Sequence, residues 1–178
     1  MKNFEVTSLE DGKRYWISRS VAVSLFLFIR DGKEIYVLSN KRGKGSADFQ
    51  GLWNCPCGYL DFDETGEEAA VREVREETGY ILDSKEIDLH KVITCPSQNH
   101  QNVTLRYVCE KDISELKILA GDFGGEEEEE EVEEVKLINI KDVDNYEWAF
   151  GHKEIIKEIL LEKKYFNNEK VVINNIYR

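Results

Sequence analysis

The stretch GYLDFDETGEEAAVREVREETGY, residues 58 to 80, contains the clearest local structure in this chain of 178 residues. Thr65 and Glu68 have the spacing of a capping box, in which each side chain bonds the other residue's backbone N–H at the start of a helix. Gly79 stands where a left-handed C-terminal cap favours glycine. The stretch therefore predicts a helix over residues 66–78, preceded by an acidic loop.

Three carboxylates share one face of this predicted helix. Glu73, Glu76 and Glu77 are spaced i, i+3 and i+4, so they lie within about one turn of one another. Two such charges about 5 Å apart in a partly buried cleft repel by roughly 3 kcal/mol, and a divalent cation removes that repulsion. Oxygen ligands favour Mg²⁺ or Mn²⁺. On spacing alone, a charge-rich surface helix explains the pattern at least as well.

The surrounding residues narrow this choice. The chain has Gly58, five residues, Glu64, seven residues, and then the run REVREETGY at 72–80. This string resembles the signature box of the Nudix hydrolases, and all of the fixed Gly, Glu and Arg positions are present. Tyr80 replaces the bulky aliphatic residue that is usual in the family. Just before the box, Cys57 stands where the family usually has a second glycine.

The resemblance implies an α/β fold, a Nudix-like α/β/α sandwich with a mixed β-sheet, formed by residues 1–178 as a single domain. It implies a Mg²⁺-dependent hydrolase, with Mn²⁺ as a second suitable ion, that cleaves the pyrophosphate linkage of a nucleoside diphosphate joined to another moiety. ADP-ribose or a nucleotide sugar is the first candidate substrate. A nucleoside triphosphate pyrophosphohydrolase and a non-catalytic nucleotide-binding or regulatory module are the alternatives.

The same likeness assigns roles to individual residues. The implied catalytic residues are Arg72, Glu73, Glu76 and Glu77. The implied metal ligands are the carboxylates of Glu73, Glu76 and Glu77 and the backbone carbonyl of Cys57. The implied structural residues are Gly58, Gly79 and Glu64, which pairs with Arg72. The general base is either a box glutamate or an acid from a later loop, for which the glutamate run 126–131 is the obvious source.

Outside the box, the pattern predicts further strands and one more helix. Residues 20–42 alternate in hydrophobicity around Asp31-Gly32, which predicts a hairpin. The polar, glycine-rich residues 41–51 predict a loop. Further strands are predicted at 52–56, 90–95, 103–110, after the acidic run, and at 171–178. Residues 151–166 predict an amphipathic helix with Ile155, Ile156, Ile159 and Leu160 on its apolar face.

Four cysteines at 55, 57, 95 and 109 allow more than one interpretation. A zinc site is conceivable, but the Cys-x-Cys spacing lacks the two-residue separation of ordinary zinc knuckles. Alternate residues of a strand also point to opposite faces of the sheet. Buried structural thiols are therefore favoured over a zinc site or a catalytic thiol.

The substrate contacts are less clearly marked. Arg42 and Arg106 are candidate phosphate ligands because guanidinium groups match phosphate oxygens. Pro96 lies 16 residues after Tyr80, which resembles a marker of ADP-ribose pyrophosphatases. The segment AFGHKEII, residues 149–156, loosely resembles a stretch found in ADP-ribose-related and sugar-nucleotide-related members. Three aromatic residues are candidates to stack on a base, although a core position is favoured for each: Phe28, Trp53 and Tyr107.

The composition sets limits on compartment and partners. The formal net charge of −12 argues against nucleic acid or an anionic membrane as the main partner. The N-terminal residues lack the apolar segment of a signal peptide, so we expect a cytoplasmic protein. A small phosphorylated nucleotide is the expected partner, and a homodimer is compatible with the sequence. Which phosphorus atom is attacked does not follow from these residues.

Overall fold

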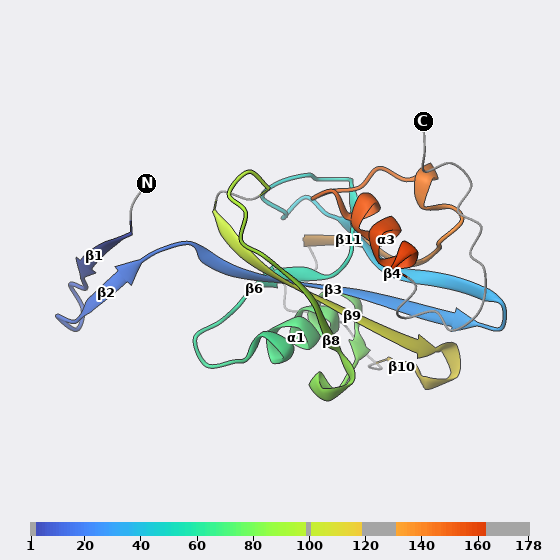
Figure 1. Cartoon of the computed structure of the whole chain (residues 1–178), viewed down its shortest axis with the longest axis horizontal. Coiled ribbons are helices and arrows are strands. Elements are labelled where there is room, and N and C mark those ends of the chain that lie inside the picture. Colours follow the sequence, from blue (N-terminus) through green and yellow to red (C-terminus); the bar gives the residue numbers. More distant parts are fainter. Residues whose placement is uncertain (1–2, 99–100, 119–130, 163–178) are drawn as a thin grey trace.

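The computed structural model describes residues 3–98, 101–118 and 131–162 (Figure 1). Its main sheet has the strand order β11-β4-β3-β9-β8. The strands are β3 (Ser20–Asp31), β4 (Glu34–Arg42), β8 (Asp88–Ile93), β9 (Asn102–Asp112) and β11 (Val132–Asn139). β3 and β9 are parallel, whereas the other neighbours along this path are antiparallel. The prediction of a mixed sheet is therefore confirmed.

The apolar run in β3 explains why helices cover both faces of the sheet. Successive side chains of a strand point to opposite faces. Phe26 and Phe28 pack with residues of α3 (His152–Leu161), whereas Leu25 and Leu27 pack with residues of α1 (Gly66–Thr78). Figure 1 shows the two helices on opposite sides of the sheet. This arrangement confirms the predicted α/β/α sandwich.

Helix α1 begins and ends where the sequence predicts. Thr65 is the N-cap, and its capping box with Glu68 is formed on both sides. Gly79 has φ 74°, and its N–H donates to the carbonyl of Arg75 at 2.9 Å. Val74 is fully buried against the sheet, and burying such a side chain stabilises the fold by about 1.5–3 kcal/mol. The caps and this contact fix the rotation of the carboxylate face.

Strand β3 changes its partner along one edge. Residues 28–31 pair with β4, whereas residues 22–24 pair with β6 (Cys57–Tyr59). The short strand β5 (Trp53–Asn54) pairs with β4. β3 and β4 therefore separate at this end, and the segment that leads into α1 is paired to both of them.

Smaller elements complete the described residues. β7 (Tyr80–Ile81) pairs with β10 (Lys117–Ile118) after α1. Short 3₁₀ turns cover Ser84–Glu86, Ile113–Glu115 and Val143–Asn145. None of the helices within residues 3–98, 101–118 and 131–162 is long and apolar enough to cross a membrane.

An N-terminal hairpin was not anticipated from the sequence. β1 (Phe4–Thr7) pairs with β2 (Arg14–Ile17), and Figure 1 shows this hairpin projecting away from the main sheet. Its exposed large side chains are Phe4, Val6, Tyr15, Trp16 and Ile17. The predicted strand at 171–178, residues 163–166 of the predicted helix and residues 126–130 of the glutamate run lie outside the described residues.

Candidate functional site

A cavity of about 840 Å³ opens at the end of the sheet where β3 and β4 separate. Asn102, Thr104 and Arg106 line it from alternate positions of β9, so they share one face of that strand. Ala22 and Ser24 are paired with Thr104 and Arg106 and also line the cavity. Cys57 and the box itself reach the same space, the box through Gly58, Tyr59, Asp61, Arg72, Glu73 and Glu77.

The carboxylate of Glu73 lies directly against the backbone of Gly58. A Cβ atom at position 58 would overlap both carboxylate oxygens and the Cδ of Glu73. Burial raises the pKa of Glu73, opposed by the neighbouring Arg72. Glycine at position 58 therefore makes room for a partly desolvated carboxylate that faces the cavity.

Glu77 lies on the same side of the helix and also faces the cavity. Its Oε2 accepts a hydrogen bond from the backbone N–H of Cys57 at 3.3 Å. Burial raises the pKa of the Glu77 carboxyl well above its usual range, and the negative charge of Glu73 adds to this effect. Two acidic side chains, Glu73 and Glu77, are thus held close together in a site of reduced dielectric, where their negative charges repel each other.

The backbone of Cys57 points toward these carboxylates. Leu25 N–H donates to Pro56 O and Leu60 N–H donates to Val21 O. In an antiparallel ladder such bonds alternate along the strand, so Cys57, opposite Ser24, is a non-hydrogen-bonded position. Its N–H and C=O therefore point away from β3, on the side where its N–H meets Glu77. The φ of Cys57 is not positive, so a side chain is tolerated here.

Arg72 holds the box together through five hydrogen bonds. Its Nε and Nη2 donate to the two carboxylate oxygens of Glu64 at 3.0 and 2.8 Å. Nη2 also donates to the carbonyl of Tyr59 at 2.9 Å, and Nη1 donates to Glu73 and Glu76 at 2.8 Å each. The guanidinium lowers the pKa of Glu64 through these bonds. All five N–H groups of Arg72 are used.

Glu76 is placed differently from the other two box glutamates. Its Oε2 accepts from Arg72, and its Oε1 lies 3.5 Å from Nη2 of Arg75. It is not among the residues that line the cavity, whereas Glu73 and Glu77 are. Of the three carboxylates that the spacing places on one helical face, two face the cavity and one faces arginines.

One glutamate of the acidic run belongs to this site. Glu131 lines the cavity, and its negative charge contributes to the raised pKa of Glu77. Arg42 also lines the cavity, and its charge acts on Glu77 in the opposite direction. Its Nε donates to the carbonyl of Asp48 at 2.7 Å.

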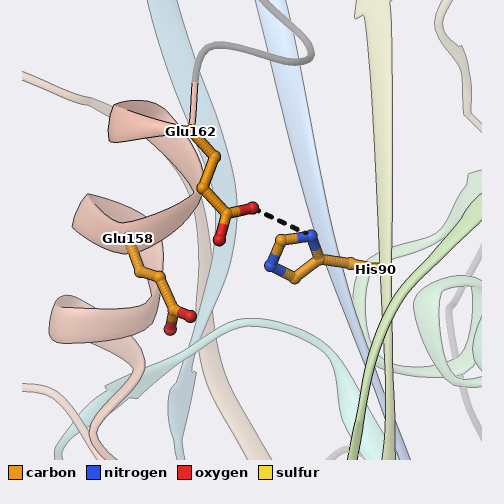
Figure 2. A group of neighbouring side chains, drawn as sticks. All are labelled: His90, Glu158 and Glu162. Atoms are coloured by element: carbon orange, nitrogen blue, oxygen red, sulfur yellow. Dashed lines mark ion pairs between the residues drawn. The ribbon is translucent and has the colours of Figure 1, made fainter.

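Two basic residues of the cavity lining, Lys91 and Arg106, are ion-paired with α3. Lys91 Nζ lies 2.5 Å from Glu158 Oε1, and Arg106 Nη1 lies 3.3 Å from Glu158 Oε2. Figure 2 shows Glu158 on α3 and Glu162 at the C-terminal end of that helix, with Glu162 pointing toward His90. His90 Nδ1 lies 3.6 Å from Glu162 Oε2. Ligand atoms of these three residues lie within 4.8 Å of one another, but Lys91 and Arg106 already neutralise Glu158 and oppose a cation there.

The residues predicted to contact substrate have different positions. Arg42 and Arg106 line the cavity. Pro96 is exposed and is not among the lining residues, whereas Gln98, two residues later, is. Phe28, Trp53 and Tyr107 are buried in the core, so the base-stacking alternative for them is wrong.

Several lining residues were not identified from the sequence. Lys91, Asn102, Thr104 and Phe150 line the cavity. For Asn102 and Thr104 the available signal was their alternate spacing with Arg106 along β9, because residues two apart share a face. His152 also lines the cavity, is buried, and accepts a hydrogen bond from the Cys55 N–H at its Nδ1, 3.0 Å away.

The cysteines do not form a zinc site among the described residues. All four are free: Cys55 and Cys109 are buried, and Cys95 is exposed. Within the part of the chain that the structure describes, the only cluster of at least three potential His, Cys, Asp or Glu ligands contains no cysteine. Burial raises the pKa of Cys109 to about 11. The prediction of buried thiols therefore holds for Cys55 and Cys109 and is wrong for the exposed Cys95.

Comparison with known proteins agrees with this geometry. The family model described as NUDIX domain matches residues 18–159. An ADP-ribose pyrophosphatase of Methanocaldococcus jannaschii is 28% identical over 156 residues, which cover 88% of this chain and 83% of that protein.

Solved structures show the same fold. The NUDIX domain of Shewanella oneidensis NrtR, complexed with ADP ribose, has a TM-score of 0.65 and 23% identity, covering 82% of this chain and 89% of that one. A bifunctional NMN adenylyltransferase/ADP ribose pyrophosphatase of Francisella tularensis, complexed with AMP and a Mn ion, has a TM-score of 0.64 and 22% identity, covering 82% and 42%. With the family match over most of its length, this chain belongs to the Nudix family and is a Nudix pyrophosphohydrolase.

Proposed function

We propose that this enzyme hydrolyses the pyrophosphate linkage of a nucleoside diphosphate joined to another moiety, with ADP-ribose or a nucleotide sugar as the first candidate. The observation that carries the proposal is that Glu73, Glu77 and Cys57 line the same cavity as Lys91 and Arg106. A phosphorylated substrate needs both a site for cations and fixed positive groups. The name of the Methanocaldococcus jannaschii relative supports the substrate class.

Glu73, Glu77 and Cys57 fit a divalent cation. Their donors are carboxylate oxygens and a backbone carbonyl, the ligand types that Mg²⁺ and Mn²⁺ prefer. Burial raises the pKa of both Glu73 and Glu77, and negative neighbours add to it, Glu76 and Glu64 at Glu73 and Glu73 at Glu77; a bound cation relieves such repulsion. We therefore assign Glu73, Glu77 and the Cys57 carbonyl as ligands, and Glu76 as a ligand only if it leaves Arg72. Mg²⁺ bound there supplies charge neutralisation for the phosphate oxygens and a more acidic water.

The protein groups have distinct tasks in hydrolysis. Arg72 positions Glu73 and braces the loop through Glu64 and the Tyr59 carbonyl. Arg42 and Arg106 bind phosphate oxygens and hold the pyrophosphate in line with the attacking water. The general base takes a proton from that water at a carboxylate oxygen. Both proposed sources of this base, a box glutamate and the acidic run through Glu131, contribute side chains to the cavity.

A screen with product analysis tests the proposal. The purified enzyme is incubated with ADP-ribose, nucleotide sugars and nucleoside triphosphates, each with Mg²⁺ or Mn²⁺, and products are identified by mass. We expect two monophosphate products from a diphosphate derivative. Release of pyrophosphate from triphosphates alone would favour the triphosphate pyrophosphohydrolase instead. Reaction in ¹⁸O-labelled water identifies the phosphorus that is attacked.

A variant pair separates catalysis from simple binding. Glu73→Gln with Glu77→Gln should reduce hydrolysis by about 100-fold or more, in the range expected when catalytic proton transfer is lost. Glu147→Gln is a matched control, because Glu147 is exposed and is not among the residues that line the cavity. Unchanged turnover in the double variant would refute the site assignment. Nucleotide binding without any turnover in the wild type would favour the non-catalytic module.

We also propose that residues 1–178 form one Nudix domain, that the enzyme acts in the cytoplasm on small nucleotides rather than on nucleic acid, and that it is a homodimer. The net charge of −12 supports a small-molecule substrate.

The exposed apolar side chains of the β1–β2 hairpin support self-association, because such patches commonly mark interfaces. Light scattering on the wild type and on Trp16→Asp tests the dimer, and a monomeric wild type would contradict it.

A further inference from the structure

Two phenylalanines at the rim of the cavity have an unusual backbone. Phe49 has φ 55° and Phe150 has φ 56°, and among the described residues they are the only non-glycine residues with positive φ. A bulky residue in this region is strained, and glycine adopts the same conformation without cost. Both positions nevertheless carry a large aromatic side chain.

The two rings contact each other although their residues lie about a hundred positions apart in the chain. Their centroids are 5.0 Å apart and the ring planes meet at 72°. Phe49 is 50% exposed and Phe150 is 45% exposed. The strained backbone therefore does not bury the rings in the core. It presents them, as a pair, to solvent.

The pair lies beside the substrate cavity. Phe150 lines the cavity, and the guanidinium of Arg42 lies 5.0 Å from its ring centroid. Arg42 lines the cavity too, and its Nε is bonded to the carbonyl of Asp48, the residue before Phe49. One arginine thus connects both aromatic residues to the space that holds Glu73 and Glu77.

We propose that Phe49 and Phe150 form the binding site for the nucleobase of the substrate. Rings inclined at 72° make a corner, so a planar base that stacks on one ring meets the other edge to face, the two arrangements that aromatic groups prefer. Arg42 provides positive charge next to this corner, where the first phosphate of a nucleotide follows its base and ribose. The inference rests on the proposed function, because it assumes a nucleotide substrate.

The chemistry of the corner favours a base over a second protein chain. Two half-exposed rings beside a cavity offer stacking area for a small flat molecule. Stacking of a base on an aromatic side chain changes affinity by about tenfold or more and does not depend strongly on base identity. We therefore expect modest discrimination among adenine, guanine and pyrimidine nucleotides.

Equilibrium binding tests the site without requiring turnover. AMP and ribose 5-phosphate differ only by the base, so the ratio of their dissociation constants in the presence of Mg²⁺ measures the contribution of the base. We expect AMP to bind about tenfold more tightly to the wild type. Phe49→Leu and Phe150→Leu should each reduce that ratio several-fold, whereas Phe150→Tyr should retain it.

Two controls make the outcome decisive. Phe62→Leu removes another fully exposed phenylalanine and should leave the ratio unchanged. Ribose 5-phosphate should bind all variants equally, which excludes a general loss of folding. Equal binding of AMP and ribose 5-phosphate by the wild type, or an unchanged ratio in both leucine variants, overturns the proposal. Absence of hydrolysis in the substrate screen contradicts the proposed function and leaves this binding ratio as a separate result.

Discussion

The carboxylate of Glu73 occupies the space that a side chain at Gly58 would need, since a Cβ there would overlap its oxygens. The end of a glutamate side chain moves easily, so Gly58→Ala should displace Glu73 at little cost in stability. We expect hydrolysis to fall about 100-fold, because a displaced carboxylate misplaces the reacting groups. Steady-state kinetics and thermal unfolding of the same preparation check both parts.

Gly66→Ala is the matched control for this change. A Cβ at Gly66 would overlap the ring hydroxyl of Tyr107, whose carboxylate partner is Glu67, and the Cδ1 of Leu105; none of these three residues lines the cavity. Overpacking of this kind costs about 1–3 kcal/mol, so stability should fall and activity should fall much less. If Gly66→Ala instead lost more activity than Gly58→Ala, the proposed role of Gly58 in making room for the Glu73 carboxylate would be contradicted.

The three box glutamates should differ in their contribution to activity. Glu73 and Glu77 line the cavity, whereas Glu76 accepts from Arg72 and lies near Arg75. Glu76→Gln should therefore reduce kcat about tenfold, and Glu73→Gln and Glu77→Gln by about 100-fold or more. Titration of each variant with Mg²⁺ should show that activity depends less strongly on the metal in Glu73→Gln and Glu77→Gln than in Glu76→Gln. Equal losses in all three would indicate that Glu76 turns into the cavity during the reaction.

Arg72→Lys should destabilise the loop between β6 and α1. Lysine cannot reproduce the bidentate contact with Glu64 or the planar set of five donors. A double-mutant cycle with Glu64→Gln should give a coupling energy of about 1–3 kcal/mol, as for partly buried charged hydrogen bonds. Urea unfolding measures it. A coupling near zero would mean that the pair is no stronger than a surface ion pair.

His152 should give the free energy of unfolding a specific pH dependence. The imidazole takes up a proton near pH 6.5 in the unfolded chain, but burial lowers its pKa to about 3 in the folded protein. Between these values the unfolded state binds more protons, so stability falls as the pH drops below 6.5. This group alone contributes a slope of at most about 1.4 kcal/mol per pH unit.

The variant His152→Gln removes this contribution. Its stability relative to the wild type should be constant above pH 7.5 and should improve steadily between pH 6 and pH 4. Urea unfolding across that range measures the difference. Parallel pH profiles for the two proteins would show that His152 is accessible to protons in the folded state.

The parts of the fold that were predicted depend on local interactions. Thr65, Glu68 and Gly79 cap α1 through contacts within a few residues, so its bounds follow from the sequence. The β3–β4 hairpin follows from Asp31-Gly32 in the same way. The orientation of Glu76 toward Arg72 does not follow from helical spacing, because it depends on where Glu64 places the guanidinium.

The parts that were missed depend on pairing between distant segments. Phe28, Trp53 and Tyr107 are aromatic, so their side chains are of a type that can stack on a base. Only their burial between the sheet and the helices, which the sequence alone does not establish, excludes base stacking. Lys91 and Thr104 reach the cavity because β8 pairs with β9 and β9 with β3. The β1–β2 hairpin carries the same turn signal as β3–β4, Asp11-Gly12, but its strands are short and their exposed side chains show no buried face that would have marked them as strands.

The pairing of β6 with β3 has a consequence for how this position can vary. The direction of the Cys57 carbonyl is set by the backbone register, Ser24 with Cys57 and Val23 with Gly58, and not by the thiol. Any residue with an ordinary φ would present the same oxygen. Replacement of Cys57 by alanine or serine should therefore leave hydrolysis nearly unchanged, so small residues are interchangeable at this position as long as its neighbour stays glycine.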